Sequence, residues 1–328
     1  MPAISTLGLT KEFDGLLAVN QVTLDIPEGE LFGLLGPNGA GKTTFISMLY
    51  TMQKPTSGKA QVCGYDVERE PSEVRKCIGV VFQDPSLDQY LTGRENLDFH
   101  GRLYGMEKEE RKKHIEEVLD LVELRERADH LVKTYSGGMR RRLELARGLL
   151  HSPRVLFLDE PTLGLDPQTR RAIWEYIKKL NQEKKISIIL TTHYMDEADA
   201  LCQRIAIIDE GNIIALGTPN ELKNVLAGDV VHLVSSNQAK LMKGLKDLDW
   251  IVNMKLVDGV ISLNVKDGEG AIPKVIEAAR TMGIQVSSVG LRKPTLEDVF
   301  IHYTGKTIRE EEGGTRETIR SIVRARTR

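Results

Sequence analysis

The chain has 328 residues, a formal net charge of −2 at pH 7 and 28% charged residues. A balance this close to neutral argues against a surface built to bind a polyanion, so we expect no nucleic acid among the partners. A chain of this length can bury roughly three quarters of its unfolded surface, which allows one large domain or two.

The cysteines and the apolar runs indicate the compartment. Cys63, Cys77 and Cys202 are widely spaced and form no CxxC pair, so we expect them to be reduced and buried, as in a cytosolic protein. No apolar run approaches the roughly 18 residues of a membrane-spanning helix, and the N-terminus lacks the charged start and apolar core of a signal peptide. If the protein works at a membrane, we expect the membrane part to be a separate chain.

The first two thirds of the chain alternate predicted strands with predicted helices. Residues 3–30 alternate apolar and polar positions around turn signals, which predicts short antiparallel strands. Apolar runs typical of buried parallel strands lie at residues 31–35, 78–83, 154–159 and 186–190. Helical patterns lie at residues 92–126, 139–150, 168–181 and 194–202. We therefore predict an α/β fold with a mostly parallel sheet, an antiparallel β subdomain and a helical subdomain at about residues 89–150.

After about residue 220 the order of predicted elements changes. Residues 229–290 read as strand, helix, two strands, helix and strand. This β-α-β-β-α-β order predicts a small ferredoxin-like α+β domain at residues 221–305, with a last helix from Pro294. For the charged tail, residues 306–328, we expect a flexible, frayed terminus, with a weak basic amphipathic helix as the alternative.

The most specific motif is GPNGAGKTT, at residues 36–44. It lies between an apolar run and a helical segment, the strand–turn–helix context that the pattern G-x-x-x-x-G-K-[ST] requires. The glycines let successive N–H groups point inward and form an anion cradle, to which the helix dipole adds. The residues expected to contact the nucleotide are Gly36, Pro37, Asn38, Gly39, Ala40, Gly41, Lys42, Thr43 and Thr44.

Two side chains of this loop are expected to contact the phosphates and the metal ion. Lys42 should reach the β- and γ-phosphates, and the Thr43 hydroxyl should ligate Mg²⁺. The glycine order differs from the G-x-G-x-x-G of a dinucleotide fingerprint, so the loop predicts a nucleoside triphosphate site.

Four further segments follow in a fixed order: Gln83, YSGGMRRRLELARGLL at 135–150, VLFLDEPTLGLDP at 155–167, and His193. With the phosphate loop they resemble the ATP-binding cassette (ABC) ATPases, the nucleotide-binding subunits of ABC transporters. The resemblance covers residues 1–220 and implies a P-loop ATPase domain there. It also implies ATP and Mg²⁺ as cofactors, with ATP hydrolysis coupled to transmembrane transport.

Two carboxylates end the strand at residues 154–159. Asp159 would be costly there unless paired, so Mg²⁺ held together with Thr43 is its expected partner; a helix cap is the weaker alternative. Glu160 is the candidate general base that takes a proton from the attacking water, with a solvated loop acid as the alternative.

Two more residues complete the expected catalytic set of Glu160, His193, Gln83 and Lys42. His193 ends a strand, where its imidazole could donate to the γ-phosphate. A lone histidine in such a place is more often structural, but the resemblance implies the switch histidine of the family. Gln83 resembles the family residue that contacts Mg²⁺ and the attacking water, so the expected metal ligands are Thr43, Gln83 and Asp159.

The triplet Ser136, Gly137 and Gly138 starts a helix and forms a second anion-binding terminus. The resemblance implies that it binds the γ-phosphate of ATP held on a facing subunit, so that two copies close head-to-tail around two nucleotides. A helix N-cap by Ser136 is compatible with this role. Tyr135 and Met139 replace the Leu and Gln of the usual LSGGQ.

Two further nucleotide contacts follow from the resemblance alone. The stretch Leu163–Asp166 matches the loop that crosses the dimer interface, which places Asp166 beside the nucleotide. Phe13 occupies the position where the family stacks an aromatic ring on adenine; a core phenylalanine is the alternative.

The C-terminal segment PTLEDVFIHYTGK resembles the daunorubicin-resistance exporters, and ENLDFHGRLYG at 95–105 resembles the helical region of exporter cassettes. The implied protein is cytoplasmic and peripheral on the inner face of the cell membrane. There it would drive a separate transmembrane permease that exports drugs or other hydrophobic compounds. Cargo, direction and permease are left open, and the C-terminal domain either contacts or regulates the dimer or is inert.

The alternative is a soluble ABC ATPase without a membrane partner. Repair and chromosome cassettes carry long coiled-coil insertions, but only 93 residues separate Lys42 from Ser136. Translation cassettes carry two ATP sites in one chain, whereas this chain has a single phosphate loop. The transporter subunit is therefore the favoured hypothesis.

Overall fold

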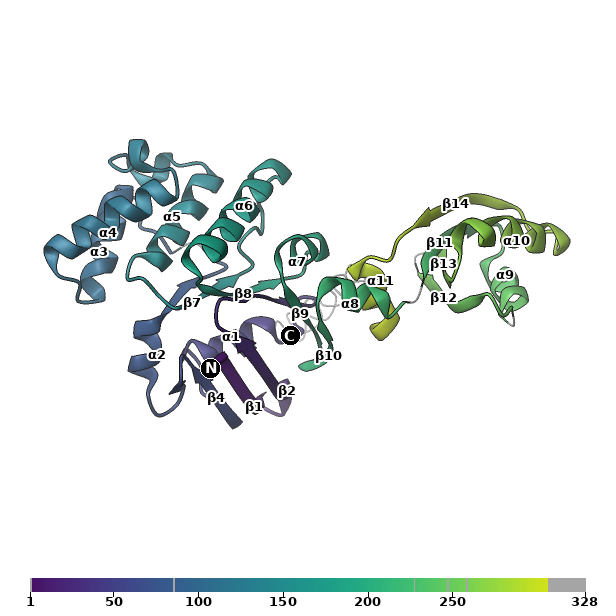
Figure 1. Ribbon diagram of the computed structural model, residues 1–328, viewed down its shortest axis with the longest axis horizontal. Coiled ribbons are helices and arrows are strands. Elements are labelled where there is room, and N and C mark those ends of the chain that lie inside the picture. The colour runs from purple at the N-terminus through teal and green to yellow at the C-terminus, as the bar shows by residue number, and fades with distance from the viewer. Residues whose placement is uncertain (1, 85, 227, 247, 258, 306–328) are drawn as a thin grey trace, which may run out of the picture. The chain divides into compact units, whose positions relative to one another are not determined.

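The computed structural model describes residues 2–84, 86–226, 228–246, 248–257 and 259–305 (Figure 1). The chain divides into two compact units between Ala215 and Leu216. The charged tail, residues 306–328, lies outside the described residues. Within the described residues no helix combines the length and the apolar character needed to cross a bilayer.

The central sheet of the first unit comprises β3 (Leu31–Leu35), β6 (Ile78–Val81), β7 (Val155–Asp159), β8 (Ser187–Thr192), β9 (Arg204–Asp209) and β10 (Asn212–Gly217). The strand order is β10-β9-β3-β8-β7-β6, and the pairs from β9 to β6 are parallel. Every residue of β3, β7 and β8 is buried. Because both faces of the sheet are buried at these strands, their sequences are continuous apolar runs. The predicted mostly parallel sheet is confirmed.

A second, four-stranded sheet contains β1 (Pro2–Phe13), β2 (Leu16–Pro27), β4 (Ser57–Val62) and β5 (Tyr65–Asp66), in the order β2-β1-β4-β5. The pairs β1–β2, β1–β4 and β4–β5 are antiparallel, as predicted, but β1 and β2 are each 12 residues long rather than short. Helix α1 (Lys42–Leu49) is buried along most of its length. Ile4 of β1, Phe45 of α1 and Phe157 of β7 share one apolar core, so the helix that carries the phosphate loop is fixed by packing.

The helical subdomain contains α3 (Gly93–Leu103), α4 (Lys108–Leu121) and α5 (Gly137–Leu149), which lie side by side (Figure 1). The predicted helical stretch 92–126 is two helices, because Gly105 adopts a positive φ of 69° between them. Thr92 and Glu95 form a capping box that fixes the start of α3. Two 3₁₀ turns, Arg125–Arg127 and Val132–Thr134, connect α4 to α5.

Three more helices complete the first unit: α2 (Pro71–Cys77), α6 (Pro167–Lys184) and α7 (Met195–Leu201). The short helix α2 was absent from the sequence prediction. It begins on Pro71, whose fixed φ suits the first helical position.

The second unit comprises α8 (Pro219–Asn224), β11 (Asp229–Ser235), α9 (Gln238–Leu245), β12 (Ile251–Val257), β13 (Val260–Val265), α10 (Gly268–Thr281), β14 (Val286–Arg292) and α11 (Leu296–Thr304). Its sheet has the order β12-β13-β11-β14, with antiparallel neighbours. A core that includes Leu233, Leu241 and Val275 joins the sheet to α9 and α10. This order and direction of strands are those of a ferredoxin-like fold, as predicted.

Helix α5 approaches the central sheet through two glycines. A Cβ added to Gly79 of β6 would lie 2.1 Å from the carbonyl oxygen of Gly148 on α5. Contact this close is possible only without a side chain, since a Cβ would force the helix off the strand. The pair therefore sets the distance between the helix and the strand that leads to Gln83.

We expect Gly79→Ala to lower the free energy of unfolding by about 1–3 kcal/mol, because the added methyl overpacks this contact. Gly290→Ala on β14 is the matched control, since a Cβ there meets no atom within 4 Å. Urea denaturation of both variants measures the difference. Equal stability of Gly79→Ala and the parent would show that the helix moves without cost.

Candidate active site

The phosphate loop links β3 to α1 at the carboxyl edge of the parallel sheet. A Cβ on Gly36 would lie 2.2 Å from the Ile208 carbonyl oxygen, and one on Gly41 would lie 2.3 Å from the Ala18 carbonyl oxygen. Gly41 also has a left-handed φ of 102°. Backbone packed this tightly on the outside of the loop excludes side chains at both positions, so the motif glycines are required by the fold.

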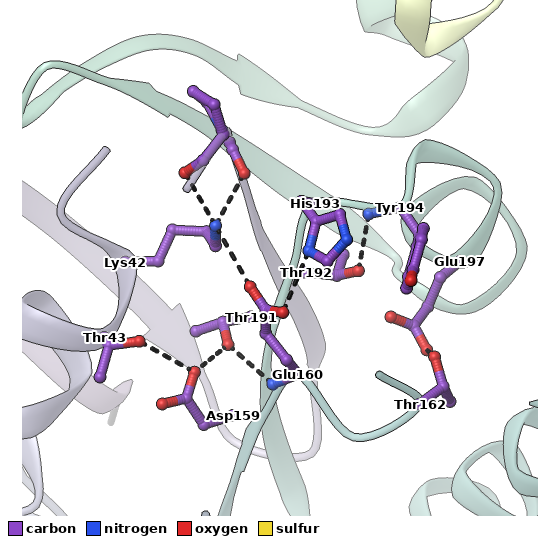
Figure 2. A network of polar contacts seen from close by, with 12 residues as sticks. Lys42, Thr43, Asp159, Glu160, Thr162, Thr191, Thr192, His193, Tyr194 and Glu197 are labelled. Carbon is purple, nitrogen blue, oxygen red and sulfur yellow. Dashed lines mark hydrogen bonds and ion pairs between the residues drawn. The ribbon is translucent and has the colours of Figure 1, made fainter. Parts of the chain in front are cut away.

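Lys42 is buried, with 5% of its surface exposed, and its ammonium group connects the loop to β7. Nζ donates hydrogen bonds to the carbonyl oxygens of Gly36 at 2.8 Å and Pro37 at 2.9 Å, and lies 3.4 Å from Glu160 Oε1 (Figure 2). A buried cation is tolerated only with such partners. The loop and the candidate base are therefore held together by one charge.

Asp159 is buried at the end of β7 and accepts hydrogen bonds from two hydroxyl groups. Thr43 Oγ1 donates to Asp159 Oδ1 at 3.2 Å, and Thr191 Oγ1 donates to the same oxygen. Burial raises the pKa of Asp159, and the two hydroxyl hydrogen bonds oppose that shift without cancelling it. A carboxylate with this environment favours a nearby cation.

The oxygen atoms around Asp159 fit Mg²⁺. This ion takes octahedral oxygen ligands at about 2.0–2.1 Å, which places neighbouring ligand atoms about 3 Å apart. Thr43 Oγ1 and Asp159 Oδ1 are 3.2 Å apart, and Gln83 lines the same cavity as Thr43. Among the described residues no three His, Cys, Asp or Glu side chains converge; Mg²⁺ is commonly held by one or two protein oxygens together with waters and phosphate oxygens.

Glu160 follows Asp159 in a strained conformation, with a left-handed φ of 46°. Its N–H donates to Thr191 Oγ1 at 3.0 Å, and its Oε2 lies 3.0 Å from His193 Nδ1 (Figure 2). Burial favours the neutral acid, but His193 and Lys42 outweigh burial and lower the pKa of Glu160. The carboxylate is thus ionised at neutral pH, as a general base must be, and backbone strain of this kind clusters at active sites.

A cavity of about 350 Å³ brings six residues of the phosphate loop together with two of the predicted catalytic residues, Gln83 and Glu160. Its lining combines the phosphate loop with the residues that follow β6 and β7. The lining residues are Ala18, Asn38, Gly39, Gly41, Lys42, Thr43, Thr44, Gln83, Glu160 and Leu163.

Ser136 and Gly138 line a different cavity, of about 680 Å³, bounded by α4, α5 and α6. Ser136 caps α5 by accepting a hydrogen bond from the Met139 N–H at 3.2 Å. A Cβ on Gly138 would lie 2.6 Å from Thr169 Cγ2 of α6. Within one chain Ser136 and the phosphate loop therefore line separate cavities.

The remaining predicted contacts lie outside both cavities. Asp166 is exposed and caps α6 by accepting from the N–H groups of Gln168 and Thr169. Phe13 ends β1 with 38% of its surface exposed, so it is not a core residue, and Lys11 Nζ lies 4.8 Å from its ring centre. Tyr135 is buried, and its hydroxyl donates to the Arg127 carbonyl oxygen at 2.6 Å.

The structure adds Arg141 of α5, which sequence reasoning missed. Its buried guanidinium donates to the carbonyl oxygens of Pro161 at 2.6 Å and Phe82 at 2.7 Å. It thereby joins the segments that follow β7 and β6, next to Glu160 and Gln83. The sequence contained a signal for this residue: Arg141 is spaced so that it shares one helical face with Leu145 and Leu149. That face is buried in α5, and a charged residue there is unusual.

Thr191 and Glu197 were also missed. Thr191 binds both Asp159 and the Glu160 N–H, as described above. Glu197 of α7 is fully buried and accepts hydrogen bonds from the Thr162 hydroxyl at 2.7 Å and Trp174 Nε1 at 2.9 Å. Burial raises the pKa of Glu197, although these hydrogen bonds favour the carboxylate. Its role is to order the loop that carries Glu160.

Two family models match the chain. One, described as ABC transporter, matches residues 19–163. The other, described as the C-terminal domain of DrrA1-3-like ATP-binding proteins, matches residues 217–304.

Curated relatives match over nearly the whole length. The chain is 41% identical to the daunorubicin/doxorubicin resistance ATP-binding protein DrrA of Streptomyces peucetius, over 92% of each chain. It is 38% identical to the linearmycin resistance ATP-binding protein LnrL of Bacillus subtilis, over 92% of this chain and 98% of the relative. It is also 38% identical to the Nod factor export ATP-binding protein I of Rhizobium sp., over 93% of this chain and 97% of the relative.

Solved structures match about two thirds of the chain. That of cbiO1 from Clostridium perfringens, part of an ABC transporter complex, has a TM-score of 0.64 and 29% identity over 69% of this chain and 93% of that one. The dimeric cassette MJ0796, bound to ADP and Pi in a post-hydrolysis state, has a TM-score of 0.59 and 30% identity over 66% and 98%. The chain therefore belongs to the ABC transporter ATP-binding proteins, as an ATPase of the branch that contains the drug-resistance and export cassettes.

Proposed function

We propose that two copies of this chain close around two ATP molecules, and that hydrolysis drives a separate membrane permease exporting drugs or other hydrophobic compounds. The main support for a dimer is that Ser136 lies apart from the phosphate loop of its own chain. Ser136 and Lys42 line different cavities of one chain, so a single ATP can meet both only if the serine comes from a second copy. A dimeric relative with ADP and Pi supports this arrangement.

The chemistry of the proposed step rests on Glu160. Its ionised carboxylate accepts a proton from the attacking water, while His193 at 3.0 Å holds the carboxylate in place. Lys42 moves from Glu160 toward the phosphates, and Ser136 of the second copy contacts the γ-phosphate. Thr43, Gln83 and Asp159 would hold Mg²⁺, which neutralises charge on the phosphates.

An exposed apolar pair on α3 supports a membrane partner. Phe99 and Leu103 lie one helical turn apart, with 60% and 68% of their surfaces exposed. Tyr90 and Tyr104 add exposed aromatic surface just outside the two ends of the same helix. Large apolar side chains exposed close together on one helix often mark interaction sites. We assign it to the permease, and we propose that the chain works at the cytoplasmic face of the membrane.

The names of three relatives mention daunorubicin resistance, linearmycin resistance and Nod factor export. These names support export as the direction of transport and a hydrophobic or amphipathic cargo.

Glu160→Gln should lower the ATPase rate at least about 100-fold, because the amide cannot accept the proton of water. Nucleotide binding should persist, and ATP should trap a dimer that gel filtration detects. Glu126→Gln, at an exposed site in the same unit, serves as the control. Hydrolysis by Glu160→Gln at the parent rate would refute the assignment of the base.

Ser136→Ala should lower hydrolysis about 10- to 100-fold while leaving ATP binding by the isolated monomer unchanged, since the serine acts on the nucleotide of the other copy. Lys42→Ala should instead weaken binding by the monomer itself. A fluorescent ATP analogue titrated at protein concentrations below dimer formation separates the two. Weakened monomer binding by Ser136→Ala would place the serine in the same site as Lys42.

Phe99→Glu should release the chain from membranes of the producing cell without changing the ATPase rate of the purified subunit, because a charge is placed in the apolar contact. Leu7→Glu, on the equally exposed Leu7 of β1, is the control and should stay with the membranes. Fractionation followed by immunoblotting measures both. Equal release of the two variants would argue against α3 as the docking surface.

A further inference from the structure

Arg170 lies against Tyr194, the residue that follows His193. It belongs to the first turn of α6, where its N–H donates to the Asp166 carbonyl oxygen at 2.9 Å. Its guanidinium carbon lies 4.0 Å from the centre of the Tyr194 ring. The centre of that ring lies in turn 4.1 Å from the centre of the His193 ring (Figure 2). A guanidinium, a phenol ring and an imidazole therefore form one contiguous series that ends beside Glu160.

Strong polar contacts do not explain the guanidinium at this position. Its Nε atom is buried and makes no hydrogen bond within the part of the chain that the structure describes. The ion pair with Asp196 is long, at 4.0 Å between Nη1 and Oδ2, and the Asp196 side chain is 67% exposed, so this pair contributes little. A planar guanidinium does, however, stack well on an aromatic face. Contact with the Tyr194 ring is therefore what this side chain is suited to make.

The packing of α7 on α6 has a separate anchor, one turn further along α6. Trp174 Nε1 donates to Glu197 Oε1 at 2.9 Å, and the Glu197 side chain is fully buried. This hydrogen bond attaches α7 to α6 without any contribution from Arg170. The contact between Arg170 and Tyr194 therefore acts on the segment before α7 and not on the attachment of the helix.

The position of the His193 imidazole depends on this short segment. Strand β8 ends at Thr192 and α7 begins at Met195, so His193 and Tyr194 form the whole connection. The Tyr194 N–H donates to Thr192 Oγ1 at 2.9 Å, which fixes the backbone of the connection. Glu160 Oε2 meets the imidazole at 3.0 Å, and the Tyr194 ring packs beside it. A shift of the Tyr194 ring would therefore move the imidazole relative to Glu160.

We propose that Arg170 is a positioning residue for His193. Arg170 lines neither of the two cavities described above, so it acts through the Tyr194 ring. By stacking on one side of that ring it holds the ring against the imidazole. The imidazole is thereby kept where it meets Glu160 and, once ATP is bound, the γ-phosphate.

The same residue links His193 to the second copy of the chain. Asp166 caps α6 by accepting from the Thr169 N–H at 3.0 Å, and Arg170 lies one helical turn further on. In the proposed dimer, residues 163–166 cross the interface. A displacement of Asp166 on contact with the facing copy therefore moves the first turn of α6, and with it Arg170 and the Tyr194 ring. The inference rests on the proposed function, because it needs both the facing copy and the hydrolysis step.

The test compares Arg170→Met with Arg171→Met in the full chain. Methionine keeps much of the length of arginine but has neither charge nor a planar group, and Arg171 is the next residue of α6 and exposed. Arg170→Met should lower the single-turnover rate of ATP hydrolysis about 10-fold, because the imidazole is no longer held in place. Its melting temperature and the affinity of the monomer for a fluorescent ATP analogue should stay those of the parent. Arg171→Met should change none of the three, and hydrolysis by Arg170→Met at the parent rate would overturn the proposal.

Variants of Tyr194 test the route. Tyr194→Phe keeps the ring and should keep the rate, whereas Tyr194→Leu should lose as much as Arg170→Met. The double variant of Arg170→Met and Tyr194→Leu should lose no more than either change alone, since both remove the same contact. Losses that multiply in the double variant would contradict an action of Arg170 through the ring.

A His193→Ala background separates positioning from a general structural effect. In that background Arg170→Met should cause no further loss of rate, because the side chain that it positions is gone. The same fold loss in both backgrounds would show an effect independent of His193 and would overturn the inference. Slow hydrolysis by His193→Ala together with a parent rate for Arg170→Met would remove the inference alone. A parent rate for His193→Ala would instead refute the role of His193 in the proposed function, and the inference with it.

Discussion

The arrangement of the ATP site depends on the burial of one ammonium group. Lys42 is shielded from water and therefore requires partners, which are two carbonyl oxygens of the phosphate loop and Glu160. Glu160 in turn lies against His193. The loop after β3, the end of β7 and the end of β8 are thereby held in one geometry by a short series of polar contacts.

Strand order makes this series of polar contacts possible. In the central sheet β3 is adjacent to β8, and β8 is adjacent to β7. Parallel strands place their carboxyl ends at one edge, so residues far apart in sequence converge there. Thr191 of β8 ties Asp159 and the Glu160 backbone together, and Arg141 extends the same network to α5 and to the segment that precedes Gln83. A movement of α5 is thus coupled physically to both ends of the site.

Much of the fold follows from the sequence, because buried parallel strands are continuous apolar runs and the phosphate loop is unusually specific. The strand order was not predictable, since it depends on which strands the crossovers place side by side. The left-handed φ of Glu160 was not predictable either, because nothing local favours it; hydrogen bonds that the Glu160 N–H donates to Thr191 hold it. Cys63 and Cys77 were expected to be buried, but one lies in a hairpin turn and the other at a helix end, where surface remains accessible.

The contact between Lys42 and Glu160 has opposite consequences before and after nucleotide binding. In the structure described here it lowers the pKa of Glu160 together with His193, which keeps the carboxylate ionised but makes it a weak base. Phosphate groups in the loop would compete for Lys42 and add negative charge beside Glu160, and both changes raise a carboxyl pKa. A general base is most effective when its pKa approaches the working pH. The interaction that stabilises the site would therefore also restrain Glu160, the proposed base, until a nucleotide binds.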